Sequence, residues 1–221
     1  MRWHKSVKNE VGFTLVEVAI VLIIIGLILG AAIKGKDLIQ SAKQKKFYSN
    51  FVKQWEVTVL DYYDRTGGVI GDGNTNGGTT ATTDGRFDNI NNATKWGAVG
   101  NPGTGVLGRL QAVGLDLPTT NTGTSYTYSF KGSTSGSRTV TLALDSLNAT
   151  TGGGGSSGTN MANNVLYFTL MPTDLAIALD NVIDGSANGK NGKFRHYPDT
   201  TDWPNVNTTT TVNAMYILDV P

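Results

Sequence analysis

The 221-residue chain contains no cysteine and only two histidines, His4 and His196. Because it can form no disulfide, its loops must be held by other contacts. The same absence excludes a cysteine–histidine catalytic site, and two histidines so placed do not make a zinc site. His196 is not accompanied by a serine-nucleophile motif. We therefore expect a protein that is not an enzyme.

Neither sign of charge dominates, since 18 lysines and arginines stand against 17 aspartates and glutamates. Bulk charge therefore indicates no nucleic-acid partner. Basic residues do gather just after the longest apolar run, at Lys34, Lys36, Lys43, Lys45 and Lys46. Lysines in this place are typical of side chains that reach the headgroups of a lipid bilayer. Contact with DNA is the alternative.

The longest apolar run extends from Phe13 to Ile33. As a helix it is about 31 Å long, which matches a hydrocarbon core of about 30 Å. The twelve residues before it carry three basic side chains and one acidic side chain: Arg2, Lys5, Lys8 and Glu10. A basic flank stays on the cytoplasmic side. We therefore expect one membrane-spanning helix over residues 13–33, with the C-terminal bulk outside the cytoplasm.

One carboxylate, Glu17, lies near the start of this run, where a charged side chain is costly and usually has a partner. The motif Gly12-Phe13-Thr14-Leu15-Val16-Glu17, followed by the apolar run, resembles the start of type IV pilins and of type II secretion pseudopilins. The resemblance implies that a prepilin peptidase removes leader residues 1–12 by cutting between Gly12 and Phe13, and that Phe13 is N-methylated. It also implies that Glu17 pairs with the N-terminal amine of a neighbouring subunit. A plain membrane anchor is the alternative, and it explains neither Gly12-Phe13 nor Glu17.

The function implied by the resemblance is that of a structural subunit of a type IV pilus-like filament, a pilin whose size of 221 residues favours a minor component. Such a subunit is inserted in the bacterial inner membrane with its C-terminus in the periplasm, and then enters a periplasmic or cell-surface filament. A pseudopilin of a type II secretion system and a tip adhesin carried on a pilin stalk are the alternatives. The implied partners are the prepilin peptidase, other pilin or pseudopilin subunits, the inner-membrane assembly platform and the lipid bilayer.

The helix is expected to continue beyond the membrane segment. No proline occurs between Lys34 and Arg65, and apolar or aromatic residues recur there at intervals of three and four. These residues are Tyr48, Phe51, Val52, Trp55, Val59 and Tyr62. The spacing predicts an amphipathic half-helix over residues 34–65, and together the two halves make a helix of roughly 50 residues.

From residue 66 onward the composition shifts to glycine, threonine, asparagine and serine, which predicts a globular domain over 66–221 with long loops at 67–84 and 148–164. Strands are expected at 126–131, 138–144, 165–170 and 212–220. Short helices are expected at 105–113 and 172–183, with Pro172 in the first turn of the second. An antiparallel sheet packed on the amphipathic half-helix would give an α+β pilin fold.

Two groups of oxygen-bearing side chains are candidate calcium ligands. Asp72, Asn74 and Asn76 have the spacing of the first half of a calcium loop, although Thr83 stands where the closing glutamate belongs. The second group surrounds a glycine-rich turn and consists of Asp180, Asp184, Asn188 and Asn191. A bound Ca²⁺ could order these loops instead of a disulfide, and plain Asx-rich turns are the alternative.

Overall fold

The computed structural model describes residues 12–101, 104–149 and 161–220. Most of the expected leader, residues 1–11, and the glycine tract 152–155 therefore lie outside the described residues. The chain divides into two compact units, Met1–Lys43 and Gln44–Pro221.

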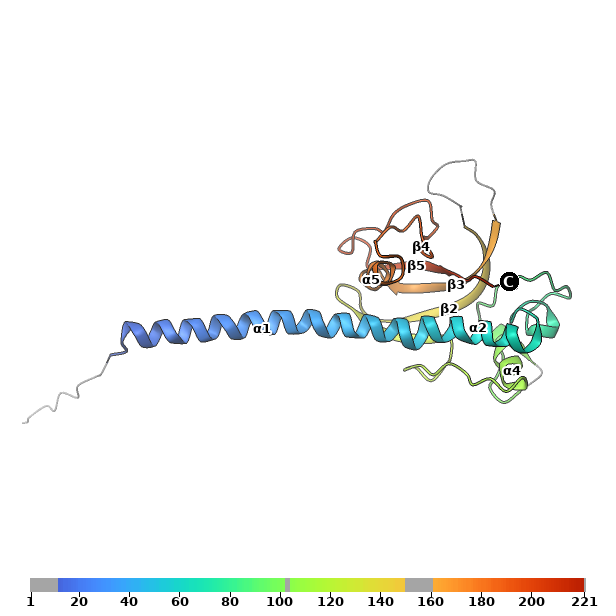
Figure 1. Cartoon of the computed structure of the whole chain (residues 1–221), viewed down its shortest axis with the longest axis horizontal. Helices are drawn as coiled ribbons and strands as arrows, with labels where there is room; N and C mark the ends of the chain where they lie inside the picture. Colours follow the sequence, from blue (N-terminus) through green and yellow to red (C-terminus); the bar gives the residue numbers. More distant parts are fainter. Residues whose placement is uncertain (1–11, 102–103, 150–160, 221) are drawn as a thin grey trace, which may run out of the picture. The chain divides into compact units, whose positions relative to one another are not determined.

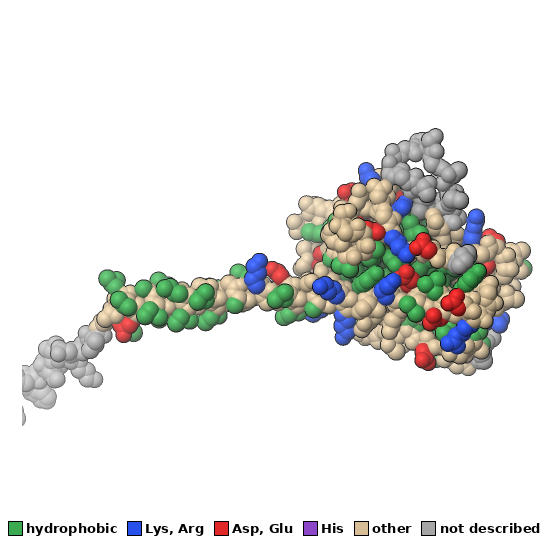
Figure 2. Space-filling view, in the orientation of Figure 1, with side chains coloured by type: hydrophobic (Ala, Val, Ile, Leu, Met, Phe, Trp, Pro, Cys, Tyr) green, Lys and Arg blue, Asp and Glu red, His purple; other side chains and the backbone are tan. Residues whose placement is uncertain are grey.

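The first unit is a helix whose apolar side chains are exposed. Helix α1 (Leu15–Phe47) begins here, and helical turns continue without a break to Thr66, over 52 residues. Figure 2 shows hydrophobic side chains on the surface along the first part of α1. The most apolar stretch has a mean hydropathy of 2.9 and no buried residue, so it is long and apolar enough to cross a membrane. The prediction of a long apolar helix that continues into the rest of the chain is confirmed.

In the second unit the helix contains a short π-helical segment, η1 (Tyr48–Val52), followed by α2 (Lys53–Thr66). A π-turn holds one more residue than an α-turn and so rotates the side chains that follow it. Here the neighbours Phe51 and Val52 are both fully buried. The helix ends at Gly67, which has a left-handed φ of 70° and donates its N–H to the Tyr63 carbonyl at 2.7 Å.

A five-stranded antiparallel sheet forms the body of the second unit, in the order β1-β2-β3-β5-β4 (Figure 1). Its strands are β1 (Thr127–Gly132), β2 (Gly136–Ala149), β3 (Met161–Pro172), β4 (Phe194–Tyr197) and β5 (Thr211–Ile217). The predicted α+β pilin architecture is confirmed. The long helix is followed by an antiparallel sheet, although β4 was not expected from the sequence.

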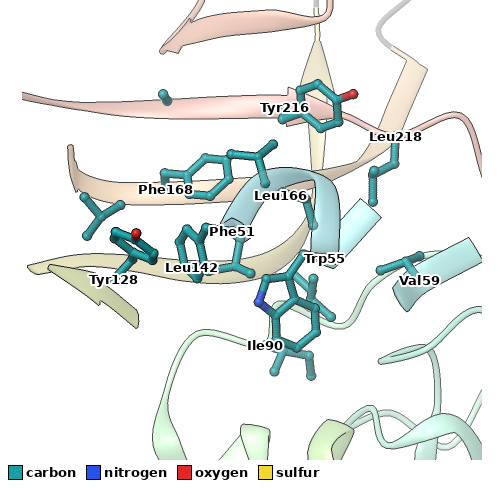
Figure 3. Packing of buried hydrophobic residues seen from close by; sticks show 14 of the residues in the cluster. Phe51, Trp55, Val59, Ile90, Tyr128, Leu142, Leu166, Phe168, Tyr216 and Leu218 are labelled. Carbon is teal, nitrogen blue, oxygen red and sulfur yellow. The ribbon is translucent and has the colours of Figure 1, made fainter. Parts of the chain in front are cut away.

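Aromatic side chains join the helix to the sheet in one core (Figure 3). The ring of Phe51 lies 5.5 Å from that of Tyr128 and 6.0 Å from that of Phe168. Trp55 packs 5.0 Å from Trp96, and its indole N–H donates to the carbonyl of Ser125 at 2.8 Å. The aromatic spacing in the sequence therefore marks the helix face that packs on the sheet.

Four short helical segments complete the described part of the second unit. They are η2 (Asn74–Asn76), α3 (Ala93–Trp96), α4 (Gly105–Ala112) and α5 (Thr173–Asp184), the last of which contacts β3, β4 and β5. The sequence predicted Pro172 in the first turn of α5, and this was wrong. Pro172 is the last residue of β3 and the N-cap residue of α5, with a φ of −54° and a ψ of 131°. The expected loop 148–164 is also too long, since β2 runs to Ala149 and β3 begins at Met161.

The loop that follows α2 is not wholly exposed, contrary to expectation, because Val69 and Ile70 are buried. One carboxylate oxygen of Asp88 organises it by accepting N–H groups from Gly73, Thr79 and Thr80 at 2.7–3.0 Å. Partial burial raises the pKa of Asp88, but these hydrogen bonds outweigh it and lower the pKa overall. Backbone-to-carboxylate hydrogen bonds thus hold a loop in a chain without disulfides.

Candidate processing and assembly site

The predicted cleavage site lies just before the first helix. Gly12, Phe13 and Thr14 have no helical structure, and α1 begins at Leu15. The side chain of Phe13 is 88% exposed, and nothing lies within 4 Å of the position that a Cβ atom on Gly12 would take. Among the described residues, nothing in the helix covers the bond between Gly12 and Phe13, and this bond is non-helical.

Thr14 and Glu17 close the start of α1 with reciprocal hydrogen bonds. The Thr14 N–H donates to Glu17 Oε2 at 2.8 Å, and the Glu17 N–H donates to Thr14 Oγ1 at 3.3 Å. The Thr14 hydroxyl also donates to Glu17 Oε2 at 2.9 Å. This is a capping box, in which the threonine is the N-cap residue and the glutamate is three residues later. In the sequence Thr14 stands out only as a member of the motif, and its spacing of three residues from Glu17 is the signal for this cap.

The capping box gives Glu17 a partner within the chain but no opposite charge. Between residues 12 and 33 the sequence contains no lysine or arginine. The exposed apolar side chains of Phe13, Val18 and Val21 line the same surface hollow of α1 as Glu17. If these side chains become buried against other helices, the carboxylate loses water and needs a cation. Cleavage after Gly12 would create one nearby, because a free α-amino group has a pKa of about 7.7–8.0 and is mostly protonated at neutral pH.

The first group of calcium candidates is directed at different partners. The two carboxylate oxygens of Asp72 accept the N–H groups of Asp84 and Gly85, at 3.1 and 2.8 Å. The side-chain oxygen of Asn76 accepts from the Tyr62 hydroxyl of α2 at 3.1 Å. Asn74 is exposed in η2, and its carbonyl accepts from Arg109. The three residues therefore lie on one loop, but Asp72 contacts residues 84 and 85 whereas Asn76 contacts Tyr62 on α2.

In the second group, Asp180 and Asp184 lie one turn apart on α5. Asp180 is fully buried, and its Oδ2 accepts the Asn188 N–H and the Trp203 indole N–H, both at 2.6 Å. Burial, together with the neighbouring Asp184, raises the pKa of Asp180 to about 6. Asp184 accepts the N–H groups of residues 193 and 194, both at 2.9 Å.

Asp72 thus joins two parts of one loop, and Asp180 and Asp184 join a loop to α5, in each case by accepting backbone N–H groups. Within the described part of the chain, no three histidine, aspartate or glutamate side chains are placed to hold a metal ion. Calcium binding by either group stays a prediction.

Comparison with protein families finds the prokaryotic N-terminal methylation motif over residues 8–33. Comparisons with curated proteins and with solved structures find no match. The motif is the hallmark of the prepilin-type N-terminus, and it covers Gly12, Phe13, Thr14 and Glu17. The motif and the fold together define the class: a protein with a prepilin-type N-terminus, an apolar first helix and an α+β pilin-like architecture. The motif and the apolar first helix support a type IV pilin-like or pseudopilin-like subunit, and the motif implies processing by a prepilin peptidase and assembly with other pilin subunits.

Proposed function

We propose that this chain is a structural, minor pilin of a type IV pilus-like filament, cleaved between Gly12 and Phe13, methylated on Phe13, and assembled from the inner membrane. The observation that carries the proposal is the arrangement of Glu17. A carboxylate without a cation on its own segment lies four residues from the amine that cleavage would create. The exposed apolar surface of α1 supplies the helix face that a filament core would bury.

In the free subunit Glu17 caps its own helix, and in the filament it pairs with the amine of a neighbour. The two roles use the same carboxylate but differ in what they need. A capping box needs only a hydrogen-bond acceptor, so glutamine fills it as well as glutamate. An ion pair in an apolar environment needs the negative charge.

Two variants separate these roles. Glu17→Gln keeps the cap and removes the charge, whereas Thr14→Ala removes the cap hydroxyl and keeps the charge. In cells that contain the matching peptidase and assembly machinery, we expect Glu17→Gln to insert and to be cleaved at the parental level but to be lost from filaments. We expect Thr14→Ala to assemble, because the charge remains.

The measurement is mass spectrometry of sheared surface filaments and of the envelope fraction. A chain that begins at methylated Phe13 in the sheared fraction supports a pilin, and a low share of the filament protein supports a minor one. The same processed chain in the envelope alone would favour a pseudopilin of a secretion system. Normal assembly of Glu17→Gln would overturn the ion-pair role, and an intact Met1 start would overturn the proposal as a whole.

A further inference from the structure

The strand β1 is one edge of the sheet, and its free side would normally offer unpaired N–H and C=O groups. The carbonyl of Tyr126, just before β1, accepts the N–H of Leu142 on β2. Because hydrogen-bonding direction alternates along an antiparallel strand, Tyr128 and Phe130 also face β2. Thr127, Ser129 and Lys131 therefore point their backbone groups away from the sheet. An edge of this kind is a template for pairing with another chain.

The segment Thr119–Thr124, here termed the edge guard, occupies most of this free side. The side-chain amide of Asn121 donates to the Ser129 carbonyl and accepts the Ser129 N–H, both at 2.8 Å. One side chain thus makes the pair of hydrogen bonds that a neighbouring strand would make. The Thr122 hydroxyl donates to the Thr127 carbonyl at 2.8 Å, and the Thr127 N–H donates to the Thr124 carbonyl at 3.2 Å.

The edge guard is held by these hydrogen bonds and not by apolar burial. Residues 121–124 are all exposed. A cavity of about 210 Å³ lies under it, lined by Asn121, Lys46, Asn50 and Tyr128 among others. A segment with little buried apolar surface opens at low free-energy cost.

The opposite edge of the sheet is closed in another way. There, the N–H of His196 on β4 donates to the backbone carbonyl of Gly189 at 2.9 Å. Gly189 is buried, and its own N–H donates to Asp202. The β4 edge is therefore covered by anchored backbone and by the Asp184 carboxylate on α5, which accepts the Phe194 N–H, whereas β1 is covered by an exposed segment that relies chiefly on its own amide and hydroxyl side chains. Of the two edges, β1 is the one that can open.

We propose that β1 is a self-pairing edge, which the edge guard keeps closed and which a second copy of the same strand occupies when the guard is displaced. In an antiparallel pair of β1 strands centred on Ser129, the backbone N–H and C=O groups of Ser129 form hydrogen bonds with those of Ser129 in the second copy. Thr127 then lies opposite a lysine and Lys131 opposite a threonine, so no like charges face each other directly. The proposal does not depend on the filament function.

The absence of cysteine permits a direct test. Ser129→Cys places a single thiol at the centre of the proposed pair, and it leaves the backbone groups that Asn121 contacts intact. The full chain is purified in detergent, with and without Asn121→Ala and Thr122→Val, and is oxidised. We expect at least ten times more disulfide-linked dimer when the two guard substitutions are present. One matched control replaces the two guard substitutions with Thr119→Ala, also within the guard. The other control keeps the guard substitutions and carries Ser186→Cys, at an exposed position, instead of Ser129→Cys. Neither control is expected to raise the yield of disulfide-linked dimer.

Hydrogen exchange of the Ser129 amide makes each outcome decisive. Fast exchange with a raised dimer yield at position 129 supports the proposal. Fast exchange without dimer means that the opened edge does not self-pair. Protection of the amide that is unchanged from the parent chain means that Asn121 does not guard the edge. Either result would overturn the proposal. Among the outward backbone groups of β1, Thr122→Val alone frees only the Thr127 carbonyl, so it should give an intermediate yield. This variant keeps the test decisive if the double variant fails to fold.

Discussion

Asp72 offers a direct test of whether carboxylates hold the loops of this chain through backbone N–H groups. The residue is 2% exposed, and its two oxygens accept the N–H groups of Asp84 and Gly85. In Asp72→Asn one acceptor oxygen remains without its charge, and the amide NH2 faces the second N–H. A hydrogen bond to a charged group contributes about 1.5–3 kcal/mol. Because the two N–H groups lie near the surface and can reach water, we expect a loss of about 2 kcal/mol.

The assay is thermal unfolding of the full chain in detergent, followed by tryptophan fluorescence. Three of the four tryptophans, Trp55, Trp96 and Trp203, lie in the second compact unit, so the signal reports on it. For a unit of this size, about 2 kcal/mol lowers Tm by about 4–8 °C. Asp61→Asn, which removes the same charge from an exposed position on α2, is the matched control and should leave Tm unchanged.

Calcium separates the two roles that Asp72 could have. If the carboxylate acts on backbone N–H groups, Asp72→Asn lowers Tm equally in EDTA and in millimolar calcium. If it is a calcium ligand, calcium raises the Tm of the parent chain by mass action and the variant loses that gain. A destabilisation that appears only with calcium would refute the reasoning from the N–H contacts.

Two further predictions concern the core and the pH dependence. Trp55→Phe loses the hydrogen bond to the Ser125 carbonyl and part of the ring that packs on Trp96. We therefore expect the free energy of unfolding to fall by about 2 kcal/mol. Denaturant unfolding measures this loss, and an unchanged midpoint would contradict the packing of Trp55. Asp180 has its folded-state pKa raised to about 6, so the folded chain holds this proton more tightly than the unfolded chain. Its contribution is therefore present below about pH 4 and is lost as pH rises through about 6. Asp180→Asn should flatten this part of the stability profile, and a slope equal to that of the parent chain would exclude Asp180 as its source.

The features that the sequence predicted well are periodic or strictly local. The aromatic spacing from Phe51 to Tyr62 identified the buried helix face, because a helix places such residues on one side whatever they pack against. The cleavage motif is a contiguous pattern, so Gly12, Phe13 and Glu17 could be named without a structure. Thr14 could have been named too, since a threonine three residues before a glutamate at a helix start is itself a local signal.

The features that the sequence did not predict depend on contacts distant in the chain. β4 has only four residues and exists because it pairs with β5, which follows it by more than ten residues. The end of β3 was misjudged at Leu170, where the register with β5 shifts and the backbone adopts a left-handed φ of 58°. A leucine rarely adopts that conformation, so nothing local indicated that the strand continues to Pro172.

The calcium candidates show why one pattern supported two interpretations. A loop in which aspartates precede glycines can aim carboxylates at a cation, but it can equally aim backbone N–H groups at a carboxylate. In the first arrangement the positive charge beside the carboxylate oxygen is that of the cation, and in the second it is the partial charge of the backbone N–H groups. Glycine favours both arrangements because it permits the tight turns of such a loop. In this chain Asp72, Asp88 and Asp184 each accept two or more backbone N–H groups from residues that lie eight or more positions away. Each such carboxylate closes a loop, as a disulfide would, and this is how a chain without cysteine can order its segments 72–88 and 184–194.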